Sequence, residues 1–316
     1  MKILLTESDA LISNGDLSLE VFEGLGDYVE YKNISREDLL KEAVDSDVIL
    51  CNKVLIDREV FKIAKKLKYV GTCATGYNNV DTCCARENGV CVCNVAGYST
   101  NAVAQQVMAY ILNHYTRLDK YNEFVKADGW KKAKIFAPLV YTTEEVYGKT
   151  LGIIGYGSIG KAVEKAALGF GMNVIVNTRT VREKDKKFVS LDELLEKSDI
   201  VTIHCPLTEQ SADMMNKDAF AKMKDGAFFI NTARGGVVVE EDLYNALESG
   251  KLSGAAVDVL KTEPMAGNCV LANAKNITIT PHTAWAPYST RKRLVEMVAE
   301  NLRAFLNNEE VNNLAK

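Results

Sequence analysis

Short apolar runs alternate with helical patterns along the first hundred residues of the chain. Each run has four or five residues and is rich in Val, Ile, Leu, Tyr or Cys, which predicts a buried strand. The predicted strands are Lys2–Thr6, Tyr28–Tyr31, Val48–Cys51, Tyr69–Cys73 and Val90–Cys93. Between them, Ser35 stands three residues before Asp38 as in a capping box, and Gly89 follows a helical pattern as a C-terminal cap. This alternation predicts a doubly wound α/β domain whose parallel sheet is covered on both faces.

A second α/β unit follows a long helical pattern. Apolar residues recur at helical spacing from Ser99 to about Tyr121, which predicts one unbroken helix that connects two domains. The next segment, residues 122–147, is polar, aromatic and irregular, and we expect it to leave the fold and to contact a second copy of the chain. Six further strands are predicted at Leu151–Ile154, Asn173–Asn177, Ile200–His204, Ala227–Asn231, Ala255–Asp258 and Ile277–Thr280.

The last part of the chain is predicted to return to the first unit. After Pro287 one helical stretch remains, Arg291–Leu306, and it is too short to form a domain of its own. We therefore expect it to pack on the first unit, which makes that unit discontinuous. The predicted domains are residues 1–98 with 287–316, and residues 99–286.

Composition and charge exclude several classes of function. The 316 residues are 47% hydrophobic and 25% charged, and the net charge of −4 gives no reason to expect nucleic acid as a partner. No apolar run approaches the ~20 residues that a membrane helix needs. The apolar start after Lys2 is also too short for a signal peptide. We therefore expect a cytoplasmic protein that binds neither nucleic acid nor a membrane.

The eight cysteines do not form a metal-binding pattern. They lack the C-x-x-C spacing of zinc sites, and Cys91 and Cys93 alternate with valines as strand residues do. Buried thiols in a reducing compartment behave as small hydrophobic side chains. We therefore expect no metal site.

A glycine pattern follows the first predicted strand of the second unit and opens a helical pattern. Gly155 permits a tight turn, Gly157 lets a pyrophosphate approach the backbone, and Gly160 lets the helix pack closely on the strand. The N-terminus of the helix supplies free N–H groups and a favourable dipole for an anion. The pattern predicts a dinucleotide-binding site that also includes Ser158 and Ile159.

Three chemically capable side chains stand in loops after later strands: Arg234, Glu263 and His282. In a parallel α/β sheet, ligands bind outside the carboxyl ends of the strands. Arg234 can bind a carboxylate and polarise a carbonyl, His282 can transfer a proton, and Glu263 can orient the imidazole. Further cofactor contacts are predicted in the loops at Cys205, Pro206, Thr232 and Ala233, and again at Arg234 and His282. His114 and His204 are expected to be structural.

The same loops resemble the D-isomer-specific 2-hydroxyacid dehydrogenase family. The segments HCPLTEQS, NTARGG, DVLKTEP and PHTAWA are similar to that family's sequence blocks, and Arg234, Glu263 and His282 fall on its catalytic positions. Residues 73–81 and 94–105 look most like glycerate dehydrogenases, also called hydroxypyruvate reductases. The resemblance covers nearly the whole chain. It implies a flavodoxin-like substrate domain, a Rossmann dinucleotide domain and a homodimer.

This resemblance also implies a reaction, the reduction of hydroxypyruvate or glyoxylate by hydride transfer from a nicotinamide. His282 would protonate the forming alkoxide, Glu263 would support His282, and Arg234 would bind the substrate carboxylate. Asp258 falls on the position that contacts the nicotinamide carboxamide. Further substrate contacts would come from the backbone of Ala74, Thr75 and Gly76.

The residues after the second strand of this unit predict which dinucleotide is used. An NAD-specific site has an acidic residue there, which binds the ribose 2′-hydroxyl. Thr178 occupies that position, 18 residues after Gly160, and Arg179 can pair with a 2′-phosphate. Thr178, Arg179 and Thr180 are therefore predicted cofactor contacts. We expect NADP to be preferred over NAD.

Other functions remain open at this point. D-lactate and phosphoglycerate dehydrogenases share the fold, although the 34 residues after His282 leave no room for the regulatory domain of many phosphoglycerate enzymes. Formate dehydrogenases of the superfamily carry Gln where this chain has Glu263. A dinucleotide-sensing corepressor also shares the Arg, Glu and His trio, and the lack of long disordered or basic flanks counts against it.

Overall fold

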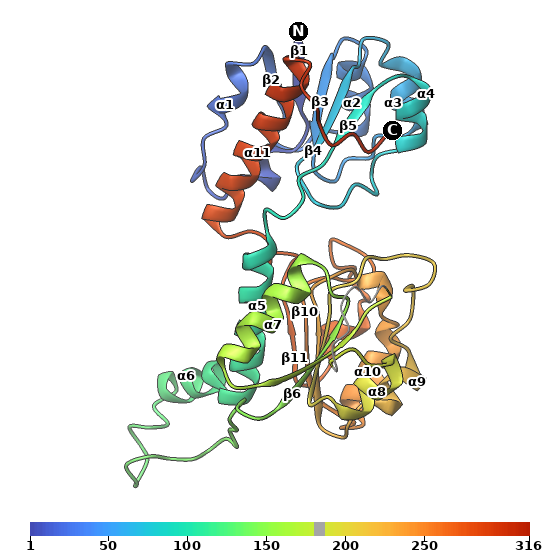
Figure 1. Cartoon of the computed structure of the whole chain (residues 1–316). Coiled ribbons are helices and arrows are strands. Elements are labelled where there is room, and N and C mark those ends of the chain that lie inside the picture. The colour runs from blue at the N-terminus through green and yellow to red at the C-terminus, as the bar shows by residue number, and fades with distance from the viewer. Residues whose placement is uncertain (180–186) are drawn as a thin grey trace. The chain divides into compact units, whose positions relative to one another are not determined.

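The computed structural model describes residues 1–179 and 187–316. Thr180, one of the predicted cofactor contacts, lies outside the described residues. The chain forms two compact units, one made of Met1–Ser99 with Ala286–Lys316 and the other of Thr100–Trp285 (Figure 1).

The first unit is built on a parallel sheet. Its described strands are β1 (Lys2–Leu5), β2 (Asp27–Glu30), β3 (Val48–Cys51), β4 (Tyr69–Thr72) and β5 (Cys91–Cys93). They are arranged in the order β2-β1-β3-β4-β5, and every neighbouring pair is parallel. This order is that of a flavodoxin-like, doubly wound sheet, so the predicted fold class of this unit is confirmed.

Helices cover this sheet, and their ends follow the sequence signals. The described helices are α1 (Glu20–Glu23), α2 (Arg36–Ala43), α3 (Arg58–Ile63), α4 (Thr82–Glu87) and α11 (Tyr288–Leu306). The Ser35 hydroxyl caps α2 by accepting from the N–H of Asp38 at 3.1 Å and donating to its carboxylate at 2.7 Å. Gly89, just beyond α4, has φ of +67°, which suits glycine. Both cap predictions are confirmed.

The C-terminal helix α11 is part of the first unit. Arg291 of α11 is 6% exposed and donates to both carboxylate oxygens of Asp16, at 2.9 and 2.6 Å. The Phe305 ring lies 4.9 Å from the ring of Tyr69 on β4. The guanidinium of Arg291 lowers the pKa of Asp16 to about 2. An ion pair with a buried guanidinium and an aromatic contact therefore hold the returning helix.

The second unit is a longer parallel sheet. Its described strands are β6 (Thr150–Ile154), β7 (Asn173–Asn177), β8 (Ile200–Ile203), β9 (Ala227–Asn231), β10 (Leu252–Val257) and β11 (Ile277–Ile279). They are arranged in the order β11-β10-β9-β8-β6-β7, all parallel, and a single bridge from Val176 to Phe188 adds a further pairing on β7. The chain reverses its direction of progress across the sheet between β6 and β8. This is the doubly wound dinucleotide fold, as predicted.

Helices lie on both faces of this sheet (Figure 1). The described helices of the second unit are α5 (Thr100–Thr116), α6 (Leu118–Lys126), α7 (Ser158–Gly169), α8 (Leu191–Lys197), α9 (Lys217–Lys222) and α10 (Glu240–Glu248). Buried side chains of α5 and α7 form one apolar cluster with the sheet, and those of α8, α9 and α10 form another. The sheet is therefore buried on both faces, which explains its nearly continuous apolar strands.

The single helix predicted from Ser99 to Tyr121 is wrong. Helix α5 ends at Thr116, and Arg117 has a left-handed backbone with φ of +55°. A second helix, α6, begins at Leu118 and runs into the segment that was expected to be irregular. The Asn113 side chain of α5 accepts from the N–H of Asp119, in the first turn of α6, at 3.2 Å. The periodicity of apolar residues in the sequence continues through this junction. The left-handed backbone of Arg117 nevertheless changes the direction of the chain.

Two further features bear on expected functions. In residues 1–179 and 187–316, no helix is long and apolar enough to cross a membrane. All eight cysteines lie in these ranges as free thiols, and five of them are buried: Cys51, Cys73, Cys84, Cys91 and Cys93. These five behave as small core side chains.

Candidate active site

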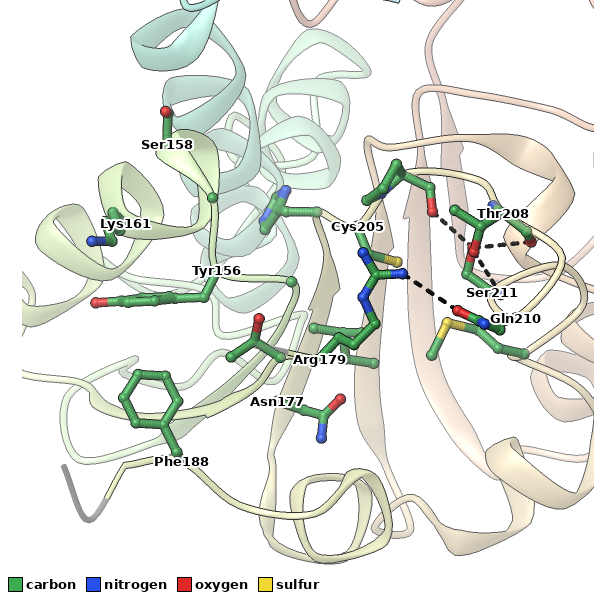
Figure 2. A pocket seen from close by; sticks show the side chains of 17 residues that line it. Tyr156, Ser158, Lys161, Asn177, Arg179, Phe188, Cys205, Thr208, Gln210 and Ser211 are labelled. Atoms are coloured by element: carbon green, nitrogen blue, oxygen red, sulfur yellow. Dashed lines mark hydrogen bonds between the residues drawn. The ribbon is translucent and has the colours of Figure 1, made fainter. Parts of the chain in front are cut away.

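A cavity of about 960 Å³ opens where the strand order of the second unit reverses (Figure 2). It lies at the carboxyl ends of β6, β7 and β8, where ligands bind in this fold. The predicted cofactor contacts that line it are Gly155, Gly157, Ser158, Thr178, Arg179, Cys205 and Pro206. Three segments far apart in the sequence therefore meet at the site predicted for a dinucleotide.

The three glycines take the positions that a dinucleotide requires. Gly155 has φ of +93°, and a Cβ there would lie 2.5 Å from the backbone nitrogen of Cys205. A Cβ on Gly160 would lie 2.4 Å from the carbonyl oxygen of Gly155, so the helix packs directly on the turn. A Cβ on Gly157 would meet no protein atom within 4 Å and would fill open space in front of the N-terminus of α7. A diphosphate fits this space, because N–H groups and a positive helix dipole face it.

The described lining of the pocket carries two cations and no carboxylate. Thr178 and Arg179 follow β7, and the two cations are Lys161 and Arg179. Arg179 Nη1 donates to Gln210 Oε1 at 3.4 Å, a long contact that leaves the guanidinium within the pocket (Figure 2). This surface can accept a 2′-phosphate.

A carboxylate beside the pocket, that of Glu164 on α7, is already paired. Lys187 Nζ donates to Glu164 Oε1 and to the Tyr156 hydroxyl, both at 2.8 Å, and that hydroxyl donates to Glu164. The hydrogen bond to Glu164 raises the pKa of Lys187 above its usual value. The negative charge of Glu164 is therefore balanced within the protein.

Glu263 and His282 lie in hydrogen-bond contact. Glu263 Oε2 is 2.7 Å from His282 Nδ1, and Glu263 Oε1 accepts from the N–H of Leu260 at 3.0 Å. Since a carboxylate only accepts, the imidazole donates from Nδ1 and its Nε2 is left for other chemistry. The two side chains are 33% and 25% exposed, so the pair is accessible. This arrangement can hold and deliver a proton at Nε2.

Buried Asn231, at the end of β9, braces the loop that carries Arg234. Its side chain donates to the Arg234 carbonyl at 2.9 Å and accepts from the N–H of Ala233 at 3.0 Å. A Cβ on Gly235 would lie 1.9 Å from the carbonyl carbon of Leu260, so this loop packs backbone to backbone against the loop of Glu263. Sequence reasoning missed both positions, although an Asn at a strand end and a Gly-Gly pair are recognisable signals.

The hydroxyl of Thr232, a predicted cofactor contact in this loop, is buried. Within the described residues its Oγ1 has no hydrogen-bond partner. A buried hydroxyl without a partner is costly, so it is well suited to bond a ligand. This observation fits a cofactor at the carboxyl edge of the sheet.

Asp258 holds the loop that carries His282. The carboxylate is 2% exposed and accepts from the Thr280 hydroxyl and from the N–H groups of Thr283 and Ala284, both at 2.9 Å. Its carbonyl accepts from the N–H of His282 at 2.8 Å. Burial raises the pKa of Asp258. The structure thus assigns its carboxylate to bracing this loop, and its predicted contact with the nicotinamide stays a prediction.

The other two histidines are packed into the second unit. His114 stacks on Phe228 with ring centres 3.9 Å apart and lies 3.0 Å from the Ser253 hydroxyl. His204 lies 3.0 Å from the Thr202 hydroxyl. Burial lowers the pKa of His114 to about 4 and that of His204 to about 3, so both are neutral near pH 7. This agrees with the structural roles expected for them.

In the first unit, the predicted substrate-binding loop, residues 74–76, is braced at the carboxyl edge of its sheet. The Thr75 hydroxyl donates to the Val95 carbonyl at 2.9 Å, and the Asn52 side chain donates to the Cys73 carbonyl at 2.8 Å. Within the described chain, the N–H groups of Thr75 and Gly76 donate to no protein acceptor. They are available to an anionic ligand, and their role toward the substrate stays a prediction.

A carboxylate that sequence reasoning missed, that of Glu7, supports this edge. Its Oε2 accepts from the N–H groups of Asn52 and Lys53 at 2.8 Å and of Val54 at 3.0 Å. The side chain follows β1, and only its position at a strand end could have drawn attention to it. It fixes the turn from which Asn52 reaches Cys73.

Comparison with known proteins finds similar sequences and a similar structure. A family model for the NAD-binding domain of D-isomer-specific 2-hydroxyacid dehydrogenases matches residues 108–284, more than half of the chain. The chain is 38% identical over 319 residues to the hydroxypyruvate reductase of Blautia hydrogenotrophica, a match that covers 99% of both chains. It is 39% identical over 283 residues to the glyoxylate reductase of Thermococcus onnurineus, which covers 87% of this chain and 84% of that one. The crystal structure of the TT0316 protein of Thermus thermophilus is similar with a TM-score of 0.88 and 34% identity over 99% of both chains.

The open space in front of Gly157 gives a direct test of the cofactor site. We expect Gly157→Ala to weaken binding of the reduced dinucleotide by about tenfold or more, because the new methyl group occupies the place of the diphosphate. Fluorescence titration with NADPH and NADH measures this. Gly169→Ala is the matched control, since a Cβ there also meets no protein atom but lies at the far end of α7. Unchanged affinity in Gly157→Ala would contradict the assignment.

Proposed function

The chain belongs to the D-isomer-specific 2-hydroxyacid dehydrogenase family, and we propose that it reduces hydroxypyruvate and glyoxylate to D-glycerate and glycolate. The hydrogen-bonded pair of Glu263 and His282, in the unit that holds the dinucleotide pocket, is the observation that carries this proposal. The hydroxypyruvate and glyoxylate reductases among the relatives support the choice of substrate.

In this reaction His282 supplies the proton. A reduced nicotinamide, when bound, would supply the hydride for the keto carbon. The carbonyl oxygen then carries negative charge, and His282 Nε2 donates its proton to that oxygen. Glu263 accepts from Nδ1, which keeps the ring in one orientation and stabilises the protonated imidazole before transfer. After transfer the imidazole is neutral and the product is a 2-hydroxy acid.

Arg234 is proposed to bind the keto acid. Its guanidinium matches a carboxylate in bidentate geometry and can polarise the adjacent carbonyl toward hydride attack. The side chain is partly exposed, and its backbone is fixed by Asn231. The Arg234 guanidinium donates to the Ala233 carbonyl at 2.7 Å, and other N–H groups remain for the substrate.

We propose that NADPH is preferred over NADH. The support is the charge of the described pocket lining, in which Arg179 after β7 and Lys161 on α7 are cations and no residue is Asp or Glu. A carboxylate at Thr178 would repel the 2′-phosphate of NADPH, whereas the Arg179 guanidinium attracts it. The pairing of Glu164 with Lys187 removes another source of repulsion.

We also propose that the protein forms a homodimer through the segment that contains α6 and the loop after it. Several of its apolar side chains are exposed to a degree that is unusual for a monomer: Leu118 (69%), Trp130 (54%), Ile135 (63%), Phe136 (92%), Leu139 (86%) and Tyr147 (75%). A second copy of the same chain would bury them in a self-complementary contact.

A substrate panel tests the function and the cofactor together. We expect hydroxypyruvate and glyoxylate to be reduced with higher kcat/KM than pyruvate or larger 2-keto acids, and NADPH to exceed NADH by about tenfold or more. Arg179→Ala should remove most of this difference and leave the rate with NADH nearly unchanged. A strong NADH preference would overturn the cofactor proposal. Cofactor binding without oxidation by any 2-keto acid would favour a dinucleotide sensor instead.

Two substitutions separate proton transfer from substrate binding. We expect His282→Ala to lower kcat by ~10²–10⁴-fold with nearly unchanged cofactor affinity, as is typical for a lost general acid. Arg234→Ala should act mainly by raising KM for the keto acid. Steady-state kinetics and a cofactor titration of each variant measure these effects. Near-normal activity in both variants would show that the site is assigned wrongly.

The proposed dimer contact is tested by adding charge to it. We expect the double variant Phe136→Asp, Leu139→Asp to be a monomer, because two carboxylates would have to be buried without partners. Light scattering after size-exclusion chromatography gives the mass. Val44→Asp is the control, an equally drastic change at a side chain that is 48% exposed in the first unit. A monomeric wild-type protein, or a double variant that stays dimeric, would refute the proposed contact.

A further inference from the structure

Two hydroxyl groups connect helix α5 with the buried carboxylate of Asp258. The Tyr110 hydroxyl lies 2.5 Å from Thr280 Oγ1, and Thr280 Oγ1 lies 2.5 Å from Asp258 Oδ1. Tyr110 is 5% exposed and Asp258 is 2% exposed, and Thr280 between them is partly buried. All three residues belong to the second unit.

The direction of these bonds follows from the number of hydrogens. An ionised carboxylate can only accept, so Thr280 uses its single hydroxyl hydrogen toward Asp258. Thr280 therefore accepts from Tyr110, and the Tyr110 hydroxyl is the donor. Each donor polarises the next in such a chain, which strengthens the final bond to the carboxylate.

Asp258 in turn forms hydrogen bonds with the backbone around His282. Its carboxylate accepts from the N–H groups of Thr283 and Ala284 at 2.9 Å, and its carbonyl accepts from the N–H of His282 at 2.8 Å. His282 has φ of +55°, a left-handed conformation that side-chain-bearing residues adopt rarely and that surrounding contacts must maintain. The His282 ring is separately held by Glu263.

We propose that Tyr110 and Thr280 are positioning residues of the reductase: their hydroxyls keep the Asp258 carboxylate oriented and accepting, and Asp258 fixes the backbone from which His282 delivers its proton. The inference rests on the proposed function, because it assigns to His282 the protonation of the substrate. Tyr110 lies on helix α5, outside the loops at the strand ends, and would join the residues that support His282. Neither hydroxyl touches the reacting atoms in this proposal, and both act through Asp258.

Because the Asp258 carboxylate accepts fully only when it is ionised, the positioning role of Tyr110 and Thr280 can be measured in the pH profile of kcat. Burial raises the pKa of Asp258, and the bonds from Thr280, Ala284 and Thr283 oppose that effect. The titratable side chains that face it are Tyr110 from α5 and His282 from its own loop, and burial raises the pKa of Tyr110, which remains a neutral donor. As pH falls, Asp258 takes up a proton and loses acceptor capacity for the loop. When the hydroxyl donor to its carboxylate is removed, Asp258 takes up its proton at a higher pH.

Three variants of the full-length enzyme test the proposal. We expect Tyr110→Phe to lower kcat about threefold and Thr280→Val about tenfold, with KM for the keto acid nearly unchanged, because a hydrogen bond to a charged group is lost or weakened. The acidic limb of the kcat profile should move to higher pH in the same order. Thr280→Ser retains the hydroxyl, so its kcat and the position of its acidic limb should be close to those of the wild type. Tyr115→Phe is the matched control, since Tyr115 is another buried tyrosine of α5 and its ring contacts Lys149.

Hydrogen exchange supplies a readout that does not require a substrate. The amides of Thr283 and Ala284 should exchange faster in Tyr110→Phe and faster still in Thr280→Val, and at the wild-type rate in Tyr115→Phe. If the wild-type protein reduces no 2-keto acid but these amides respond, the proposed function fails and the bracing stands. If the wild type is active and neither kcat, its pH profile nor exchange changes in Tyr110→Phe and Thr280→Val, the inference is overturned. Equal changes in thermal stability and exchange throughout the protein would also overturn it, because they indicate a general packing role.

Discussion

Parallel strand pairing is the constraint on which the second unit depends. Parallel strands place all of their following loops at one edge of the sheet, so the glycine turn and the loops with Arg234, Glu263 and His282 share that edge. Glycines then let these loops approach closely. Gly155 packs against Cys205, and Gly235 packs against Leu260, each at a distance where a Cβ would collide with backbone.

Buried polar side chains fix the loops that this arrangement brings together. Asn231 braces the Arg234 loop, Asp258 braces the His282 loop, and Glu7 braces a turn at the carboxyl edge of the first unit's sheet. In each case a side chain at a strand end accepts from or donates to backbone groups that the sheet does not use. Such groups are costly to bury without partners, so their pairing selects one loop conformation. The loops that carry Arg234 and His282 are therefore held in place at their backbones.

Much of the fold could be predicted because short-range patterns determine it. Apolar runs bounded by polar turns located the strands that the structure describes, and Ser35 and Gly89 correctly marked helix ends. The helix expected from Ser99 to Tyr121 failed at Arg117, because periodicity does not register a single left-handed residue. Seven of the predicted cofactor contacts line the pocket, whereas Ile159, Gly160 and the predicted contacts after β9, β10 and β11 are not among its lining residues. Glu7 and the hydroxyl of Tyr110 were missed, since their partners are distant in the sequence. Asn231 was missed although its partners, Ala233 and Arg234, are only two and three residues away.

The sequence by itself determined the class of fold, the family and the residue types available for chemistry. These depend on local propensity, on the spacing of glycines and on motifs within single loops, all of which are written along the chain. Only the tertiary structure decided the engagement of Asp258 by its loop and the chain of hydroxyls from Tyr110, whereas the contact between Glu263 and His282 agrees with an expectation from the sequence. Hydrogen bonds of this kind join residues up to 170 positions apart, and their geometry exists only once the sheet has brought the loops together.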